Sequence, residues 1–470
     1  MSDFADELTH LKNTGNWSGG GTPSKANPTY WEGGDIPWVS PKDMKTFEIS
    51  DSQDKITPQA IAHSPVRLVP AGSILMVVRS GILAHTFPVA IAKTDVTLNQ
   101  DMKAIIPREG IVPKFLAYQL ISQSTEILTN CTKTGTTVSS VETKLLQSLP
   151  VWIPDATKQE EIVAELDKQL SRLDETISTL QGIQLKLKQA RTSILKAAVE
   201  GRLVETEAEL SKRQGRSFES GNKLLGRTLE KRELQHHADS SKEQRSRRYK
   251  TPINPDPQSV DALKLPQGWT LASVQQASSG DRYSLCIGPF GSNLKVSDYQ
   301  ESGVPLVFVR NIRAESFSLE DATFVTPEKA AELSAHTARP GDIMITKMGD
   351  PPGDSAIYPQ GLPEAVITAD VIKMHVAPTL STRYILYALR SPLLRRQILF
   401  QTKGVAQKKV SLERFEKIAI PLPPFAEQER IAEEVDRRFS VLDQVDTTVN
   451  ASLRRCGQLR QAVLKRAFGG

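Results

Sequence analysis

With 470 residues, the chain is too long for one ordinary hydrophobic core, so we expect two or three domains. An apolar fraction of 39% with a charged fraction of 24% is typical of a globular protein, and the formal charge of +5 permits an anionic partner without requiring one. The apolar runs are too short to span a membrane, the start MSDFADEL is unlike a secretory signal, and three scattered cysteines argue against a disulfide framework, so we expect a cytoplasmic location.

Strands are expected in the first part of the chain. The runs Ile36–Val39, Val66–Val69 and Ile74–Val78 are β-branched, and Gly72 marks the gap between the last two. A short helix is expected around residues 114–128. Together these signals predict a mixed, strand-rich globular domain.

A long helix is expected over residues 158–200. Its apolar residues recur at spacings of three and four and then of seven, which predicts a heptad seam packed against another helix. About forty residues of helix span roughly 60 Å, which suits a spacer better than the cover of one small domain. The expected seam residues are Leu166, Leu170, Leu173, Ile177 and Leu180.

Residues 201–262 are polar and rich in charge, show no apolar periodicity and end in prolines. This composition predicts a partly helical, charged connector. Its basic run Arg245–Lys250 is either solvated or in contact with nucleic acid.

The second part of the chain follows the same order. Val304–Val309 and Ile343–Thr346 predict strands, residues 383–400 a short helix, and residues 426–470 a second long helix. Because two seams of the same register can bury each other, we expect the partner of each long helix to lie in the same chain. The second seam comprises Val435, Phe439, Leu442, Val449 and Leu453.

An internal repeat explains this order. At one constant offset, the residues Gly72, Asp101, Tyr118, Gly135, Gln159 and Asp167 return as Gly341, Asp370, Tyr387, Gly404, Gln428 and Asp436. We therefore expect an α+β fold with two copies of one unit, each a mixed α/β globular part followed by a long helix. The copies differ greatly outside these positions, so the scaffold is shared and the surfaces are not.

Two short motifs raise the question of an enzyme. GGGTPSK (19–25) is rich in glycine, but a nucleotide-binding loop requires glycine where Ser24 stands and a hydroxyl residue where Ala26 stands. Asp350-Pro351-Pro352 is close to the loop in which an adenine methyltransferase holds a flipped base, but Gly353 lacks the stacking ring. We expect no catalytic residue, metal site or cofactor in this chain.

The repeat instead aligns GGGTPSK with GPFGSNL (288–294), which indicates a turn at the entrance to each globular part. Unlike surfaces on a duplicated scaffold suit two-part recognition. Because a DNA duplex is itself twofold symmetric, two modules related by a pseudo-twofold axis can read two half-sites while a helical spacer sets their distance.

Five segments carry a family resemblance over nearly the whole chain: PLPPFAEQERIAEEVD (421–436), LPQGWTLASV (265–274), IPWVSPKDMK (36–45), IGPFGSNLK (287–295) and GGTPSKANPTYWEGG (20–34). With them the sequence resembles the DNA-specificity (S) subunits of type I restriction–modification enzymes. The first copy departs from the family pattern, because it lacks the LPxGW opening and begins with ELTHLKNTGNW.

The resemblance implies two target recognition domains and two helices packed as an antiparallel intramolecular coiled coil. It implies a subunit that binds a bipartite sequence of double-stranded DNA with a non-specific gap. Two modification subunits would bind S-adenosylmethionine and methylate adenine, and two motor-nuclease subunits would use ATP and Mg. The implied parts are recognition domain 1 (1–157), central spacer helix (158–200), connector (201–262), recognition domain 2 (263–425) and C-terminal spacer helix (426–470).

DNA contacts are expected from basic and polar residues in loops that follow corresponding strands or the matched glycines Gly135 and Gly404. In the first domain they are Lys42, Lys45, Arg79, Ser80, Lys133, Thr136 and Thr137. In the second they are Arg310, Asn311, Arg313, Lys347, Lys403, Gln407, Lys408 and Lys409.

Two other hypotheses remain open from the sequence. A non-catalytic coiled-coil assembly protein with two protein-binding end domains fits the modest net charge. A stand-alone nucleotide-dependent enzyme fits less well, because the loop motifs fail. Salt-sensitive binding to duplex DNA in two patches separates DNA recognition from the assembly protein. Absence of ATP or S-adenosylmethionine binding by the isolated chain would exclude the enzyme.

Overall fold

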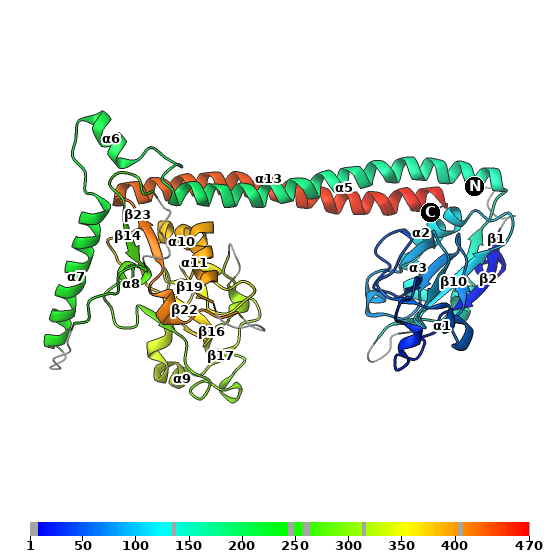
Figure 1. Ribbon diagram of the computed structural model, residues 1–470, viewed down its shortest axis with the longest axis horizontal. Helices are drawn as coiled ribbons and strands as arrows, with labels where there is room; N and C mark the ends of the chain where they lie inside the picture. The colour runs from blue at the N-terminus through cyan, green and yellow to red at the C-terminus, as the bar shows by residue number, and fades with distance from the viewer. Residues whose placement is uncertain are drawn as a thin grey trace. The chain divides into compact units, whose positions relative to one another are not determined.

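The computed structural model describes residues 8–133, 138–242, 249–256, 264–312, 316–402 and 408–469. The chain forms two compact units. The first comprises Met1–Ile183 with Thr448–Gly470, and the second comprises Gln184–Thr447. The long helices α5 (Ala156–Val199) and α13 (Phe425–Ala467) contribute residues to both units (Figure 1).

Short strands and helices build the globular part of the first unit. They are β1 Leu8–His10, β2 Gly15–Gly19, β3 Ile36–Val39, β4 Glu48–Ile49, β5 Lys55–Ile56, α1 Pro58–His63, β6 Leu68–Val69, β7 Ile74–Val77, β8 Val89–Ala92, β9 Val96–Leu98, β10 Met102–Pro107, α2 Pro113–Ser122, α3 Ser124–Asn130, β11 Thr132–Lys133, β12 Ser140–Val141, α4 Thr143–Gln147 and β13 Pro150–Trp152.

The second unit contains the equivalent elements and two additional helices that precede them. They are α6 Glu207–Gln214, α7 Gly221–Lys242, β14 Thr270–Ser273, α8 Val274–Ala277, β15 Leu285–Ile287, β16 Val304–Val307, β17 Phe324–Val325, α9 Pro327–Glu332, β18 Thr337–Ala338, β19 Ile343–Thr346, β20 Ser355–Ile357, β21 Ala365–Ile367, β22 Val371–Met374, α10 Thr382–Arg390, α11 Pro392–Phe400, α12 Leu412–Phe415 and β23 Ala419–Leu422.

The repeat seen in the sequence is present in the sheet topology. The strand order β2-β10-β7-β8 of the first unit corresponds to β15-β22-β19-β20 of the second, and β5-β3-β9-β6 corresponds to β17-β16-β21-β18. In both units a further pair joins the opening strand to the last one, β1 with β13 and β14 with β23. The two copies therefore share one scaffold, and β4 extends the first sheet of the first unit.

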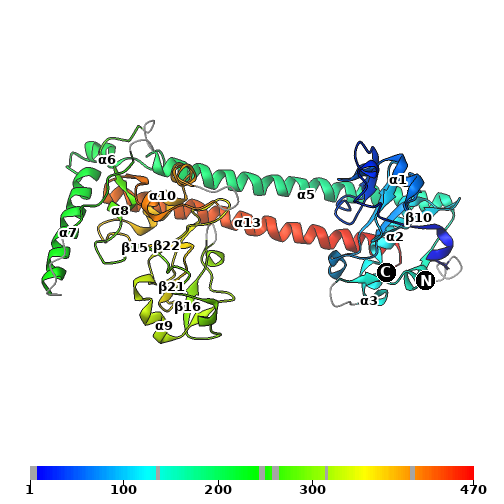
Figure 2. The same ribbon diagram turned by 60° about the horizontal axis from the view of Figure 1, so that its bottom comes forward.

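The second unit is layered. The β19–β22 sheet lies between helices α10 and α11 on one side and the β16–β21 sheet on the other, and α9 covers the far face of the latter (Figure 2). Alternate residues of β19 separate these layers, since Ile343 and Ile345 pack toward the helices and Met344 toward the second sheet. The layers explain why all four positions of β19 are buried.

The strands β3 and β19 have the predicted bounds, but each predicted short helix is two helices. In the second unit the break falls at Ser391, because Pro392 lacks a backbone donor and the Ser391 hydroxyl caps the next helix at the amide of Leu394. In the first unit Ser122 and Ser124 flank the break, and their hydroxyls donate to nearby backbone carbonyls.

The two long helices contact each other within each unit. In the first unit Leu166 and Leu170 of α5 form a cluster with Leu464 of α13. In the second unit Leu195 of α5 lies in one cluster with Val435 of α13. All ten predicted seam residues are buried or half-buried.

The segment predicted as a polar connector contributes to the second core. Leu203, Leu224 and Leu225 are buried in one cluster with Trp269, and α7 lies beside β14 and α8 (Figures 1 and 2). The segment is partly helical, as predicted, but the absence of apolar periodicity gave no sign that these leucines are buried. The start of α7 lies against the segment that leads into β14, since the amide of Gly221 donates to the carbonyl oxygen of Gly268 at 2.7 Å.

Candidate nucleic-acid interface

In the second unit, four segments that are distant in sequence meet at the turn 368–371. Backbone hydrogen bonds tie this turn to the start of the GPFGSNL loop, to the end of β16 and to the end of β19. They are Gly288 N to Val371 O (3.2 Å), Thr368 N to Val307 O (3.0 Å) and Lys347 N to Asp370 O (2.8 Å).

The first unit has the same arrangement around the turn 99–102. The GGGTPSK loop, the end of β3 and the end of β7 reach this turn through equivalent bonds. They are Gly20 N to Met102 O (3.3 Å), Asn99 N to Val39 O (2.9 Å) and Val78 N to Asp101 O (2.9 Å). We call these two sites hub 1 (turn 99–102) and hub 2 (turn 368–371).

Glycine is required at the entrance to each hub. A Cβ atom on Gly20 would lie 1.7 Å from the carbonyl oxygen of Asn99, and one on Gly288 would lie 2.2 Å from that of Thr368. Backbone cannot yield at such distances, so only glycine permits this approach. The two glycine-rich loops therefore occupy equivalent places, but Gly20 is the structural counterpart of Gly288, one residue later than the alignment of GGGTPSK with GPFGSNL predicts.

A further segment joins each hub from later in the chain. The amide of Val141 donates to the carbonyl oxygen of Val78 at 2.8 Å, and that of Val410 donates to the oxygen of Lys347 at 3.1 Å. Isolated β-bridges next to these bonds join Arg79 with Ser140 and Met348 with Lys409. Each hub thus gathers loop residues from five stretches of the chain.

Comparison with known proteins identifies the family of this chain. The sequence matches the family described as "Type I restriction modification DNA specificity domain" over residues 7–189 and 336–454. The chain belongs to this DNA-specificity family. It is a type I specificity (S) subunit, as the resemblance implied.

Two curated S subunits illustrate the relationship. The chain is 46% identical over 162 residues to the "Type I restriction enzyme EcoR124I/EcoR124II specificity subunit" of Escherichia coli, covering 34% of this chain and 40% of the relative. It is 32% identical over 163 residues to the "Type I restriction enzyme MjaIX specificity subunit" of Methanocaldococcus jannaschii, covering 34% of this chain and 37% of the relative. The alignments thus span well under two thirds of these relatives.

One solved structure has the same fold over nearly its whole length. It comes from work titled "Structural basis underlying complex assembly and conformational transition of the type I R-M system". The TM-score is 0.61 with 16% identity, and the match covers 98% of this chain and 97% of that chain.

Hub 1 of the S subunit brings together three of the predicted DNA-contact residues. Arg79 is exposed where β7 ends, and the Ser80 hydroxyl caps the following turn at the amide of Ile82. Lys133 is 72% exposed and pairs with Glu142 at 3.0 Å, on the β11–β12 pair that contains Ser140. This pairing leaves most of the lysine surface open to a ligand.

Lys42 and Lys45 follow β3 in the first unit. Lys45 is exposed, and Lys42 donates a hydrogen bond to Asp54 at 2.7 Å. This hydrogen bond raises the pKa of Lys42, so the side chain remains a cation at neutral pH.

Hub 2 gathers the cations Lys347, Lys408 and Lys409. Lys347 donates from Nζ to the carbonyl oxygen of Ala369 at 3.2 Å. Lys408 pairs with Asp350 at 3.2 Å, and Lys409 lies 3.9 Å from Asp370. Both of these lysines are about half exposed, at 49% and 48%.

Arg310 and Asn311 follow β16 but differ in accessibility. Arg310 is exposed, with its guanidinium 4.1 Å from the ring centre of Phe308. Asn311 is only 2% exposed, and its amide bonds to the backbone of Phe308 (2.8 Å) and Ser318 (2.9 Å). The Asn311 side chain therefore holds the turn after β16, and its predicted contact with DNA stays a prediction.

The remaining predicted contacts, Thr136, Thr137, Arg313, Lys403 and Gln407, lie outside the described residues.

Phe290 was not among the predicted contacts, yet it is 71% exposed on the loop that starts at Gly288. The sequence does contain a sign of this exposure, because Phe290 stands between Gly288 and Gly291. An apolar residue in such a glycine-rich loop is less readily buried in a core than one in a strand or helix.

Within the described ranges, no group of three His, Cys, Asp or Glu side chains is placed to hold a metal ion. The helices of the same ranges also lack a segment long and apolar enough to cross a membrane.

Proposed function

We propose that the chain reads a bipartite, asymmetric sequence of double-stranded DNA, one half-site through each hub. The observation that carries this proposal is that the same backbone arrangement presents unlike side chains. Arg79 and Ser140 in hub 1 stand where Met348 and Lys409 stand in hub 2. Equal scaffolds with unequal surfaces suit half-sites of different sequence.

The distance between the half-sites would be set by α5 and α13, packed as an antiparallel coiled coil with pseudo-twofold symmetry. Two ion pairs support this geometry. Asp174 pairs with Arg460, and Arg191 pairs with Asp443, and the repeat converts one pair into the other. Such an exchange is what a twofold relation between the two copies requires.

In this proposal the chain is non-catalytic and cytoplasmic, and it recruits the subunits that perform the chemistry. Two modification subunits would supply S-adenosylmethionine and methylate adenine, and two restriction subunits would supply ATP- and Mg-dependent translocation and cleavage. The recognition domains would comprise residues 1–157 and 263–425, joined by the helices and the connector between them.

Mapping methylated adenines in DNA from cells that express the chain with its modification subunit tests the proposal. We expect methylation at one sequence of two unlike parts separated by a fixed gap, and a footprint of the complex with two protected patches. Binding that is insensitive to salt, or methylation without a bipartite sequence, would favour a protein-binding assembly subunit.

A further inference from the structure

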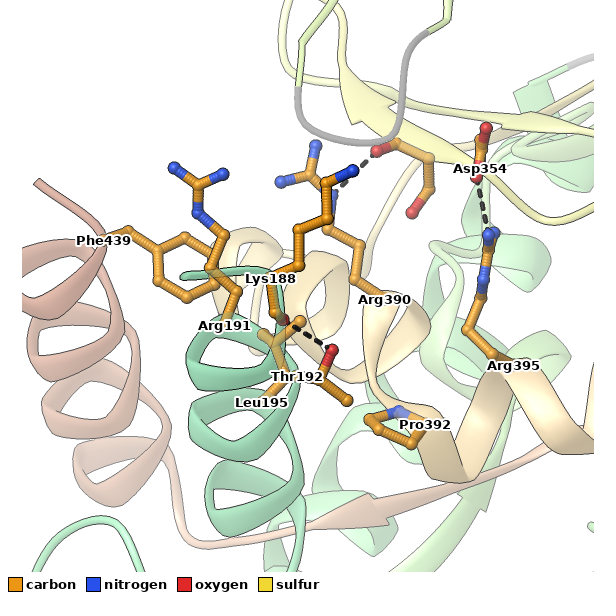
Figure 3. Close-up of a pocket in the computed structure, with 10 residues that line it drawn as sticks. Lys188, Arg191, Thr192, Leu195, Asp354, Arg390, Pro392, Arg395 and Phe439 are labelled. Atoms are coloured by element: carbon orange, nitrogen blue, oxygen red, sulfur yellow. Dashed lines mark hydrogen bonds and ion pairs between the residues drawn. The ribbon is translucent and has the colours of Figure 1, made fainter. Parts of the chain in front are cut away.

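The second unit contains a basic pocket outside hub 2. It is a cavity of about 350 Å³ between α5, the start of β20 and the α10–α11 corner (Figure 3). Four cations line it, Lys188 and Arg191 from α5 with Arg390 and Arg395 from the corner, and Asp354 is the carboxylate among the described lining residues. In Figure 3 the side chains of Lys188, Arg191 and Arg390 extend toward the same side.

Most of these cations are held in place by the fold. Arg395 donates to Asp354 at 2.7 Å, and Arg390 donates from Nε to the carbonyl oxygen of Ser355 at 2.9 Å. Arg191 pairs with Asp443 and lies over the ring of Phe439. Four cations thus line the pocket, against Asp354 in its lining and Asp443 beside it, so the charge of these side chains is positive in excess.

The repeat shows that the shared scaffold does not require this charge. The equivalent of Arg191 in the other copy is Arg460, which makes the corresponding ion pair. The other three cations are replaced, however. At the offset of the repeat, Gly457, Ile121 and Glu126 stand in place of Lys188, Arg390 and Arg395. The basic pocket is therefore a property of the second unit alone.

The pocket is continuous along the chain with hub 2. The loop 347–354 begins with Lys347 in the hub and ends with Asp354 in the pocket. The far end of this loop returns to its start, since the amide of Thr346, the residue before Lys347, donates to the carbonyl oxygen of Asp354 at 2.8 Å. A polyanion that lies on hub 2 meets the pocket next, which favours DNA over a separate acidic protein.

We infer that this pocket binds backbone phosphates of the DNA gap, beside the half-site read by the second domain. The inference rests on the proposed function. One guanidinium group can donate two parallel hydrogen bonds to two oxygens of a phosphate. Lys188 adds a single positive charge at the end of a flexible side chain on the spacer helix. Gap DNA carries no sequence information, so contacts to its phosphates fix the register of the duplex on the spacer without restricting its bases.

The test uses the full chain, in complex with its modification subunits, and a duplex carrying the target found by methylation mapping. Lys188→Gln, alone and with Arg390→Gln and Arg395→Gln, is compared with Lys186→Gln, an exposed lysine of the same helix outside the pocket. Because Lys188 is exposed, the single variant keeps the test valid if the triple variant is unstable.

We expect Lys188→Gln to reduce the slope of log affinity against log salt by about 0.9, the value for one phosphate contact, and the triple variant to reduce it further. Methylphosphonates placed at single gap positions near the second half-site should weaken binding of the wild type and of Lys186→Gln. The same substitutions should have little further effect on the triple variant. Arg191→Gln should weaken binding more than Arg460→Gln, which breaks the equivalent ion pair away from the pocket.

Equal salt slopes and equal methylphosphonate sensitivity in all variants would overturn the inference while leaving bipartite recognition intact. Loss of the modification subunits with unchanged DNA affinity would overturn it too and assign the pocket to a protein partner. If the wild type bound no duplex in two patches, the proposed function itself would fail.

Discussion

Arg460 donates a hydrogen bond from Nη1 to Oδ1 of Asp174 at 2.6 Å, and its counterpart in the repeat is the pair of Arg191 with Asp443. Each pair joins one long helix to the other within one unit. The aspartate comes from α5 in one pair and from α13 in the other. An Asp–Arg ion pair therefore links α5 to α13 in each unit, and the helix that supplies the aspartate in one unit supplies the arginine in the other.

Exchanging the charges of the first pair tests the proposed helix packing. Asp174→Arg places two guanidinium groups together, and we expect it to lower the Tm by about 2–4 °C, as a loss of about 1 kcal/mol would. Asp174→Arg combined with Arg460→Asp should recover most of this loss in thermal unfolding. Arg172→Asp, on an exposed position of the same helix, should not be rescued by Arg460→Asp. Failure of the double exchange to recover stability would contradict direct pairing of these positions.

The entrance glycines give a second prediction, on DNA binding. Gly288→Ala forces backbone apart at hub 2, and we expect a loss of about 1–3 kcal/mol in stability together with weakened duplex binding. Gly291→Ala is the matched control in the same loop, because a Cβ there meets no atom within 4 Å. Denaturant unfolding and affinity measurements on both variants check the difference. Equal stability and equal duplex affinity of the two variants would show that hub 2 does not require the close backbone approach at Gly288.

The sequence predicts those features that depend on neighbouring residues or on the internal repeat, and it does not predict contacts between residues that are distant in the chain. The bounds of β3 and β19 follow from β-branched runs, and the repeat places the two glycine-rich loops opposite each other, although the structure pairs Gly288 with Gly20 and not with Gly19. The burial of Asn311 does not follow, since an asparagine after a strand can cap the backbone or face solvent with the same neighbours. The basic pocket cannot be predicted from the sequence either, because Lys188 and Arg390 are distant in the chain and only the fold brings them together.

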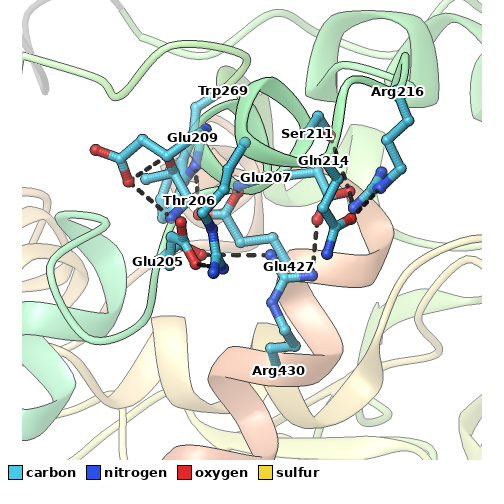
Figure 4. Close-up of polar contacts among 11 residues, drawn as sticks. Glu205, Thr206, Glu207, Glu209, Ser211, Gln214, Arg216, Trp269, Glu427 and Arg430 are labelled. Atoms are coloured by element: carbon cyan, nitrogen blue, oxygen red, sulfur yellow. Dashed lines mark hydrogen bonds and ion pairs between the residues drawn. The ribbon is translucent and has the colours of Figure 1, made fainter.

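The docking of α6 onto α13 shows the same limit (Figure 4). Glu207 is 3% exposed and pairs with Arg430 at 2.7 Å and Arg216 at 2.6 Å. Burial opposes its ionisation, but the hydrogen bonds from Arg430 and Arg216 lower the pKa of Glu207. Glu427 accepts from the indole of Trp269 at 2.9 Å. In sequence Glu207 is an ordinary charge of a polar segment, and one of its two arginine partners, Arg430, lies on the distant helix α13.

The lysines of hub 2 give a third prediction. Lys347→Glu with Lys408→Glu reverses two charges that lie beside the turn 368–371, and we expect duplex binding to weaken and its salt slope to fall by about two units. Lys417→Glu is the control, because this lysine lies in the same unit with a side chain that is 37% exposed and pairs with Glu413 instead. Affinity for the mapped target at several salt concentrations is the measurement. Unchanged affinity at physiological salt would remove these two lysines from the interface.

The pair of His375 with Asp342 gives a prediction on the pH dependence of stability. His375 Nδ1 lies 2.7 Å from Oδ1 of Asp342, a carboxylate that is 3% exposed. Its hydrogen bond with Asp342 raises the pKa of His375 above the ordinary value. The pair therefore stabilises the fold fully below about pH 6.5, and this contribution is lost as the pH rises through the folded-state pKa.

His375→Gln keeps a hydrogen-bond donor but removes the titration. We expect the variant to lose stability relative to the wild type at pH 6 and to differ from it less at pH 8.5, in thermal unfolding followed across that range. His85→Gln, at an exposed position of the first unit, should leave the difference between the two pH values as in the wild type. A constant gap between His375→Gln and the wild type at every pH would mean that the ring contributes by packing and not by its charge.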